Sequence, residues 1–252
     1  MIDVDESHFG GTIKKIKNEP DEILGFNITV PYKEKIIPFV DDLDELAREI
    51  GAVNTVKILS NGRFQGFNTD VDGITASLAE LGLSSHKISK RNVIILGAGG
   101  AARACAYTLA ANNIGVVTFS NRTLSRAKSL AAHFQERYPN TNFQVRGFNM
   151  KELDESLQDC DILINAISRS SPKYFPLRLN YSKAKREMKV LDLGYKVPPS
   201  LFFQEANDEG LKVADGLSML VEQAARSFEI WTSLKAPRKE MLLTAKAARE
   251  KI

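Results

Sequence analysis

One short stretch of the chain carries residues that could bind the phosphates of a nucleotide. An apolar run ends in a glycine turn, and the pattern of a helix follows at once. Glycines let the backbone turn sharply and approach a pyrophosphate, and the next helix directs free N–H groups at the anion. A tight turn without a ligand would give the same local pattern. The candidate cofactor residues here are Gly97, Ala98, Gly99, Gly100 and Ala101.

The next expected strand ends in residues 120–126, which could contact the adenosine ribose of a dinucleotide. At this place an acidic residue would hold a free 2′-hydroxyl, whereas arginine accommodates a 2′-phosphate. The segment has no acidic residue and contains Arg122. Arg126 could stack on adenine, and Asn121 and Thr123 offer hydrogen bonds to the phosphate. The pattern favours NADP over NAD, and the alternative is that both arginines are surface charges.

A predicted β-hairpin brings further polar residues together. Asn61-Gly62 is a strong signal for a two-residue turn, in which paired residue numbers would sum to 123. Asn54 would then lie opposite Thr69 and beside Asp70, at one end of the hairpin. The alternative is that Asp70 or Asp72 is the N-cap of the next helix.

A helix expected from Leu217 to Trp231 carries polar residues beside its apolar stripe. Gly216, Met219 and Gln223 fall on the adjacent face. Gln223 could hydrogen-bond a hydroxylated substrate and Met219 could line a nicotinamide, although Met219 alone would be assigned to the core. The stripe consists of Leu217, Leu220, Ala224, Phe228 and Trp231.

Alternating strands and helices must position these residues. Such alternation after residue 90 is typical of a parallel, doubly wound sheet. The expected strands are 93–96, 116–119, 162–165, 189–193 and 212–214, and the expected helices are 101–111, 125–137, 201–208, 217–231 and 238–251.

The pattern before residue 82 predicts a second, smaller α/β unit. Its expected strands are 2–4, 23–30, 52–59 and 63–67, and its expected helices are 9–17, 36–50 and 71–81. The acidic run 41–45 is expected to be a solvated helix face. Residues 82–90, rich in Ser and Lys, are the expected crossing between domains.

Composition excludes several classes of protein. The 252 residues are 43% hydrophobic and 26% charged, and a net charge of +3 is too balanced to indicate a nucleic-acid partner. Cys105 and Cys160 suit reduced core thiols, and the 3 histidines indicate no metal site. The acidic N-terminus does not look like a signal peptide, and no apolar run approaches the roughly 20 residues of a membrane span. We therefore expect a cytoplasmic, soluble protein.

Several motifs, in order along nearly the whole chain, together resemble the shikimate dehydrogenase family. None of them is decisive alone. They are Gly25–Lys33 (GFNITVPYK), Gly51–Thr55 (GAVNT), Gly66–Asp70 (GFNTD), the glycine turn, Asn121–Thr123 (NRT) and Asp215–Ala224 (DGLSMLVEQA).

The resemblance implies an enzyme that reversibly reduces 3-dehydroshikimate to shikimate with NADP as its cofactor. It implies that Lys33 is the catalytic acid and base and that Asp70 is its partner. An ammonium group could stabilise the negative charge on the carbonyl oxygen and then deliver a proton. The implied substrate-binding residues are Asn27, Thr29, Asn54, Asp70, Tyr195 and Gln223, and Ala166, Gly216 and Met219 join the implied cofactor-binding residues.

The resemblance also implies a two-domain α/β architecture. We expect a substrate domain over 1–81, completed by C-terminal helices over 217–252, and a Rossmann-like NADP domain over 82–216. The family begins with a strand and a helix whose Ser-x-Ser-Pro stretch holds the substrate carboxylate, and residues matching the family start at about its second strand. We therefore expect a substrate domain without that strand and helix, from a truncated reading frame, a fragment, or a chain that a partner completes.

Three functions remain open at this point. The first is an NADP-dependent shikimate dehydrogenase, and the second is a quinate/shikimate dehydrogenase. The third is a catalytically impaired NADP-binding fragment that lacks the carboxylate clamp. The expected partners are small molecules, without nucleic acid, membrane or metal, and the expected assembly is a monomer or homodimer.

Overall fold

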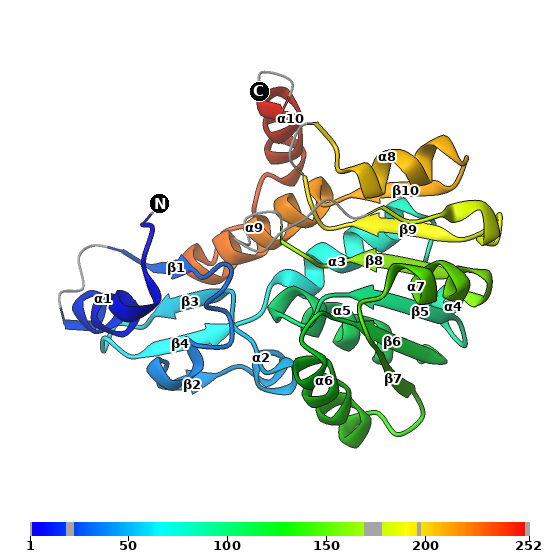
Figure 1. Cartoon of the computed structure of the whole chain (residues 1–252). Helices are drawn as coiled ribbons and strands as arrows, with labels where there is room; N and C mark the ends of the chain where they lie inside the picture. The colour runs from blue at the N-terminus through cyan, green and yellow to red at the C-terminus, as the bar shows by residue number, and fades with distance from the viewer. Residues whose placement is uncertain (1, 19–22, 169–177, 196–197, 250–252) are drawn as a thin grey trace.

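The computed structural model describes residues 2–18, 23–168, 178–195 and 198–249 of the chain. Two β-sheets lie side by side, a smaller mixed sheet from the first part of the chain and a larger parallel sheet from the second (Figure 1). The predicted two-domain α/β architecture with a doubly wound parallel sheet is thereby confirmed.

The smaller sheet has the strand order β1-β3-β4-β2. Its strands are β1 (Gly25–Asn27), β2 (Asp42–Leu43), β3 (Thr55–Ile58) and β4 (Phe64–Phe67). The strand β3 runs antiparallel to β1 and β4, and β2 runs parallel to β4. Helix α1 (Glu6–Asn18) buries Phe9 and Ile13, and the Phe9 ring stacks on Tyr32 at a centroid distance of 4.2 Å. Core packing thus fixes α1 over the segment that carries Lys33.

The larger sheet has the order β10-β9-β8-β5-β6-β7. Its strands are β5 (Asn92–Leu96), β6 (Val116–Ser120), β7 (Asn142–Arg146), β8 (Ile162–Asn165), β9 (Lys189–Asp192) and β10 (Lys212–Asp215). All pairings are parallel, so the carboxyl ends of the strands meet at one edge. The strand order reverses direction between β5 and β8, and ligands of such sheets bind in the crevice beyond that point.

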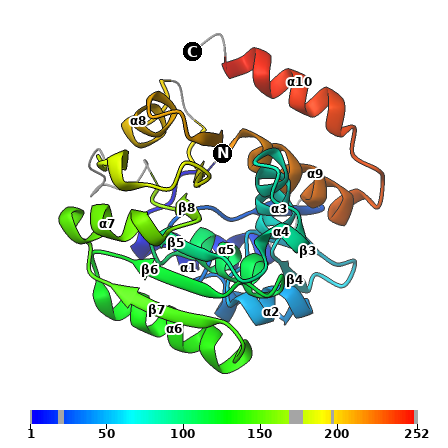
Figure 2. The same ribbon diagram turned by 90° about the vertical axis from the view of Figure 1, so that its right-hand side faces the viewer.

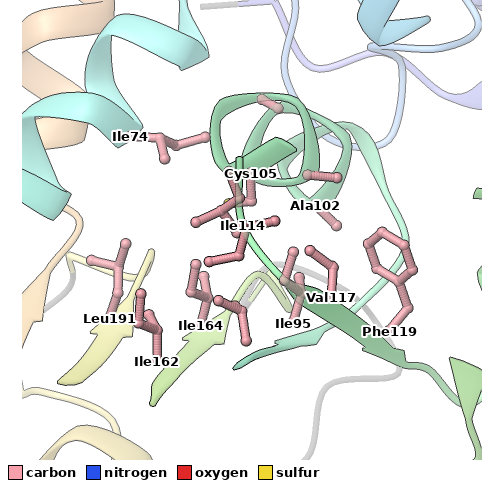
Figure 3. Packing of buried hydrophobic residues seen from close by; sticks show 14 of the residues in the cluster. Ile74, Ile95, Ala102, Cys105, Ile114, Val117, Phe119, Ile162, Ile164 and Leu191 are labelled. Carbon is pink, nitrogen blue, oxygen red and sulfur yellow. The ribbon is translucent and has the colours of Figure 1, made fainter. Parts of the chain in front are cut away.

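Helices cover both faces of the larger sheet. The helices and 3-10 turns of this part are α4 (Ser85–Ile88), α5 (Gly100–Ala110), α6 (Leu124–Arg137), α7 (Met150–Ser156), η2 (Leu157–Asp159), η3 (Tyr181–Lys183) and α8 (Leu201–Asp208). One face packs against α5 and α6, and the other packs against α7 and α8. Residues from β5, β6, β8 and β9 form a continuous apolar layer under α5 (Figure 3).

Helices α3 (Asp70–Glu80) and α9 (Leu217–Thr232) lie where the two sheets meet (Figure 1). They pack closely, because a methyl group at Gly73 would lie 2.6 Å from the carbonyl oxygen of Met219. Ile74 of α3 also joins the core over the larger sheet, in the same cluster as Cys105 (Figure 3). Helix α10 (Arg238–Arg249) packs beside α9 at the periphery and buries none of its residues (Figure 2).

Two predicted elements are wrong. Residues 2–4 form no strand, and the expected helix over 36–50 is three elements, η1 (Ile37–Phe39), β2 and α2 (Glu45–Ile50). Asp42–Leu43 pairs with Gln65–Gly66 of β4, and the Asp44 carboxylate caps α2 by accepting from Ala47 N at 2.8 Å. Pairing with a distant strand therefore overrides the local helical spacing.

The acidic run and the hairpin register also differ from expectation. Asp41, Asp42 and Glu45 of the acidic run are exposed as expected, but the run is not one helix face, and the Asp41 carboxylate accepts from Lys17 Nζ and from Phe64 N at 2.7 Å each. The hairpin pairs Thr55 with Phe67 and Ile58 with Phe64, so the sums are 122. Leu59 N donates to Arg63 O at 2.9 Å, which leaves a loop of three residues. The expected gathering of side chains is nevertheless confirmed, since Asn54 bonds both Thr69 and Asp70.

Strand β7 and helix α7 were not predicted, and of the apolar stripe named in α9 only Leu217 is buried. The buried residues of α9 are Leu217, Met219, Val221, Ala225 and Ser227. In contrast, the predicted core thiols Cys105 and Cys160 are both buried and free. Across the described residues, no helix combines the length and the apolar character that crossing a membrane requires.

Candidate active site

Lys33 and the buried Asp70 form an ion pair where the two sheets meet. Nζ of Lys33 donates to Oδ2 of Asp70 at 2.6 Å, and the side chains are 13% and 2% exposed. The backbone carbonyl of Lys33 accepts from Val53 N at 2.7 Å, and Asp70 is the first residue of α3. Thr69 takes the N-cap position without a side-chain bond, so the carboxylate of Asp70 faces Lys33 and does not cap the helix.

The Asn54 side chain orients the second carboxylate oxygen. Its Nδ2 donates to Oδ1 of Asp70 at 2.9 Å, and its Oδ1 accepts from Thr69 N at 2.8 Å. These opposite bonds define which side of the amide is nitrogen. The Asp70 carboxylate is therefore held at both oxygens, one of them by a cation.

A polar network extends from Asn54 to β1 and α9. Nδ2 of Asn27 donates to Thr55 Oγ1 at 3.0 Å and to Ser227 Oγ at 3.1 Å. The hydroxyls of Thr55 and Ser227 are 2.8 Å apart, and Ser227 donates to the carbonyl of Gln223 at 2.9 Å. Neither Thr55 nor Ser227 was predicted from the sequence as a site residue. The position of Ser227, four residues after Gln223 on one helix face, was a usable signal.

Of the other expected substrate residues, Gln223 contacts this network, whereas Tyr195 and Thr29 do not bond Asn54 among the residues that the structure describes. Gln223 Oε1 accepts from Asn54 Nδ2 at 3.4 Å, so the structure brings Gln223 to the amide that orients Asp70. Tyr195 follows β9 and is exposed, and Thr29 precedes the turn to Lys33. Within the described part of the chain, no side-chain hydrogen bond links Tyr195 or Thr29 to Asn54.

The glycine turn follows β5 and faces Lys33. Gly97 has φ +109, and its N–H donates to Ser120 O at 2.8 Å. A methyl group at Gly100 would lie 2.8 Å from Cβ of Lys33, so the first residue of α5 contacts the lysine side chain. At Gly99 an added methyl group would meet no described atom within 4 Å, and no described side chain caps α5 there. The helix N-terminus therefore presents N–H groups and open space to an anion.

The expected ribose-contacting residues follow β6, at the same sheet edge. Leu96 and Ser120 are paired in the parallel register, so the glycine turn and Asn121–Thr123 leave neighbouring strand ends. Nδ2 of Asn121 donates to Thr123 O at 2.8 Å, and Arg122 lies between them. Ala98 and Ala101 belong to the glycine turn and to the first turn of α5.

Arg126 has a partner that was not expected. Its Nη2 donates to Oε1 of Glu34 at 3.2 Å, across the boundary between the two sheets. The carboxylate of Glu34 also accepts from Nε of Arg103 at 3.1 Å. Neither Glu34 nor Arg103 was predicted to have a role.

The remaining candidates follow β8 and β10. The carbonyl of Ala166 lies against Gly97, 3.2 Å from where a methyl group would be. Gly216 packs so closely on the carbonyl of Leu193 that a methyl group would lie 2.1 Å away. Met219 packs on Gly73 of α3 and is buried, as the core assignment predicted.

A buried carboxylate that was not predicted stabilises this edge. Oδ1 of Asp192 accepts from Asn165 Nδ2 at 3.0 Å and from Gly194 N at 3.1 Å. Its Oδ2 accepts from the hydroxyl of Ser200, the N-cap of α8. Asp192 thus ties together the ends of β8 and β9 and the start of α8.

This arrangement places a proton donor and acceptor beside an anion-binding turn. The cysteine nearest to it is unsuited to nucleophilic chemistry, because burial, with a smaller contribution from Asp70, raises the pKa of the Cys105 thiol. Proton transfer through Lys33, with a dinucleotide bound at the glycine turn, is the chemistry that the site favours.

Comparisons with known proteins point to one family. The family model described as shikimate dehydrogenase substrate binding domain matches residues 1–56. The model described as shikimate / quinate 5-dehydrogenase matches residues 77–200, and that of the shikimate 5′-dehydrogenase C-terminal domain matches residues 216–242.

Individual relatives are similar over most of the chain. Shikimate dehydrogenase (NADP(+)) of Caldanaerobacter subterraneus subsp. tengcongensis is 38% identical over 211 residues, 83% of this chain and 72% of that protein. The crystal structure of shikimate 5-dehydrogenase from Thermus thermophilus in complex with NADP(H) and shikimate aligns with a TM-score of 0.78 and 32% identity, over 98% of this chain and 86% of that chain. Quinate dehydrogenase from Corynebacterium glutamicum in complex with NAD aligns with a TM-score of 0.80 and 25% identity, over 94% of this chain and 82% of that chain.

Proposed function

The chain belongs to the shikimate dehydrogenase family, and from this premise we propose that it interconverts 3-dehydroshikimate and shikimate through proton transfer at Lys33. It is an NADP-dependent oxidoreductase of the shikimate pathway. The observation that carries the role of Lys33 is its 2.6 Å contact with the buried Asp70 carboxylate, directly against Gly100 of the cofactor turn.

The side chains around Lys33 divide the work of proton transfer. NADPH, when bound, supplies the hydride that reduces the substrate carbonyl. Nζ of Lys33 stabilises the negative charge on the substrate oxygen and delivers a proton to it, and in the reverse direction it accepts that proton. Asp70 keeps the ammonium group in place, and Asn54 orients the carboxylate.

The cofactor-binding residues that we propose fit NADP. The pyrophosphate would take the open space at Gly99 and the N–H groups of the α5 N-terminus. Asn121, Arg122, Thr123 and Arg126 would hold the adenosine 2′-phosphate, since residues 120–126 include no carboxylate to repel it. Ala166, Gly216 and Met219, beyond β8 and β10, would line the nicotinamide side.

The substrate-binding residues that we propose surround the polar network. Asn54 already lies within hydrogen-bond distance of both Asp70 and Gln223, which come from other elements of the chain. Asn27 borders this group through Thr55, while Thr29 and Tyr195 would complete the site from β1 and β9.

We also propose the division of the chain into domains. Residues 1–81 and 217–252 would form the substrate domain and residues 82–216 the cofactor domain, which is supported by the packing of α9 on α3. The enzyme would act in the cytoplasm as a monomer or homodimer.

A substrate panel tests the proposed activity. Shikimate with NADP should give rapid formation of NADPH, which is measured by its absorbance. Replacing shikimate with quinate, or NADP with NAD, should give slower turnover. The rival, a quinate/shikimate dehydrogenase, is favoured by the second family model and by the similarity to a quinate dehydrogenase, and comparable rates with quinate would establish it. Binding of NADP without binding of shikimate, measured by calorimetry, would support the impaired NADP-binding protein instead.

A further inference from the structure

Glu34, the residue after Lys33, joins the two halves of the molecule through two arginines. Its Oε2 accepts from Arg103 Nε at 3.1 Å, and its Oε1 accepts from Arg126 Nη2 at 3.2 Å. Arg103 belongs to α5 and Arg126 to α6, both on the larger sheet. One carboxylate beside the catalytic lysine thus contacts two helices of the cofactor half.

Arg103 is held from a second side. Its Nη1 donates to Ile50 O at 3.2 Å, a carbonyl in the last turn of α2. The Arg103 side chain is 14% exposed, and the His133 ring bonds the neighbouring Glu49 carbonyl at 2.8 Å. Helix-end carbonyls lack partners within their own helix, so these donors secure α2 to α5 and α6. Arg103 therefore has a structural position that does not depend on Glu34 alone.

Arg126 differs from Arg103 in its exposure and in its number of partners. Its side chain is 58% exposed, and Glu34 is its one ion-pair partner within the described ranges. It lies in the first turn of α6, directly after the segment 121–123 that we propose to hold the 2′-phosphate. The same guanidinium group is thus available to two anions, a protein carboxylate and a nucleotide phosphate.

We infer that Glu34 is a specificity-determining residue that competes with the 2′-phosphate of NADP for Arg126. Binding of NADP exchanges the Glu34 contact for a phosphate contact, while the contact from Arg103 to Glu34 remains. Glu34 therefore lowers the affinity for NADP and leaves the affinity for NAD, which has no 2′-phosphate, almost unchanged. This inference rests on the proposed role of Arg126.

The competition is expected to be modest because the ion pair is largely exposed. Replacing the carboxylate with an amide should therefore tighten NADP binding by about two- to fivefold, or about 0.4–1 kcal/mol, which is the upper part of the range for exposed ion pairs. The exchange also frees NADP more readily after turnover, because Glu34 can take back Arg126 as the phosphate leaves.

The test is a double-mutant cycle read by calorimetric titration of NADP and NAD. Glu34→Gln should lower the Kd of NADP about two- to fivefold and change that of NAD less, and Arg126→Ala should raise the Kd of NADP. In the Arg126→Ala background, Glu34→Gln should no longer tighten NADP binding. Glu136→Gln, the same change at an exposed position of α6, should leave both Kd values unchanged.

Each other outcome has a defined meaning. An unchanged or higher Kd of NADP in Glu34→Gln, with Arg126→Ala still weakening binding, overturns the competition. If Glu34→Gln tightens NADP binding equally with Arg126 and with Ala at position 126, the competition is also overturned. The effect would then come from the lost negative charge of Glu34 and not from its contact with Arg126. An unchanged Kd of NADP in Arg126→Ala instead removes the proposed cofactor role of Arg126. If Glu34→Gln does not fold, Glu34→Asp, which is too short to reach both arginines, replaces it with the same expected result.

Discussion

Both oxygens of the Asp70 carboxylate are engaged by side chains, Oδ2 by Lys33 and Oδ1 by Asn54. A carboxylate that is 2% exposed needs such partners, because an unpaired buried charge is costly. At the scale of single residues, the site is therefore a linked set in which each group fixes the next. The charge of Asp70 is the part of this set that acts on Lys33, the proposed catalytic lysine.

Asp70→Asn tests that charge. The amide keeps the shape of the side chain but removes the negative charge beside Nζ of Lys33. Because general acid–base catalysis contributes about 10²–10⁴-fold to a rate, we expect kcat for shikimate oxidation to fall at least tenfold. Steady-state kinetics with saturating NADP measure it. Asp72→Asn in the same helical turn, where burial raises the pKa of the carboxyl, is the matched control and should retain full activity. Near-normal kcat in Asp70→Asn would contradict the partnership.

Gly99→Ala tests the cofactor turn. The added methyl group meets no described atom within 4 Å, so the melting temperature should be unchanged, but the group occupies the space proposed for the pyrophosphate. We expect the Kd of NADP to rise about tenfold, a loss of about 1.4 kcal/mol. Gly11→Ala, which also meets no described atom and lies in α1, should change neither quantity. Unaltered NADP binding in Gly99→Ala would mean that the pyrophosphate does not approach this turn.

At the scale of elements, the parts of the fold with strong local patterns were predictable from the sequence. The alternation after residue 90 placed β5, β6, β8, β9, β10 and α8 within about two residues, because buried strands and amphipathic helices have distinct periods. β7 was missed although Phe143 and Val145 alternate with polar residues, and Asn149, which caps α7, was a further usable signal.

Other elements could not be predicted because distant partners determine them. The strand β2 forms only because Asp42–Leu43 pairs with Gln65–Gly66. The hairpin register depends on a three-residue loop in which Gly62 has φ +75, a choice that Asn61-Gly62 alone does not specify. In the site, Glu34 contacts arginines 69 and 92 positions away, and nothing in the local sequence predicts such contacts.

The attachment of α10 gives a prediction at this scale. Arg238 donates to Glu222 at 2.8 Å and to Oε1 of Glu229 at 2.5 Å, and hydrogen bonds from Arg238 and from Ala236 N lower the pKa of Glu229 to about 2. Because this pKa lies below the ordinary 4.5, the stabilisation is present above pH 4.5 and is lost as the pH falls toward 2.

Arg238→Ala should therefore reduce the free energy of unfolding by about 1 kcal/mol at neutral pH. The difference from the unaltered chain should shrink at about pH 3, as followed by urea denaturation. Arg226→Ala, which removes a longer and more exposed contact of 3.8 Å with Glu229, should have a smaller effect. An equal loss at both pH values would contradict the assigned ion pair.

At the scale of the whole molecule, the two sheets meet at the candidate active site and at the end of α2. Oη of Tyr138 donates to the carboxylate of Glu49 at 2.5 Å, beside the bonds that His133 and Arg103 make to α2 carbonyls. Burial and this hydrogen bond raise the pKa of Tyr138, so the hydroxyl keeps its proton at neutral pH. This contact holds α2 against α6 and supports the position of Lys33 relative to Gly100.

Tyr138→Phe should lower the free energy of unfolding by about 1.5–3 kcal/mol, the range for hydrogen bonds to charged groups. Urea denaturation at neutral pH measures the change. Tyr107→Phe is the matched control, since Tyr107 packs edge-on against Tyr138 at a centroid distance of 6.3 Å and is not the residue that donates to Glu49. A loss of the same size in both variants would contradict this account, because the loss would then not depend on the hydroxyl that donates to Glu49.

The central claim is that Lys33, placed between the two halves of the molecule, transfers the proton in the reaction. The most direct measurement compares kcat with shikimate binding in Lys33→Ala, with Lys35→Ala as an exposed control on the same segment. We predict that kcat falls about 10²–10⁴-fold in Lys33→Ala, while calorimetry still detects shikimate binding and Lys35→Ala keeps full activity. Full kcat in Lys33→Ala would contradict this claim.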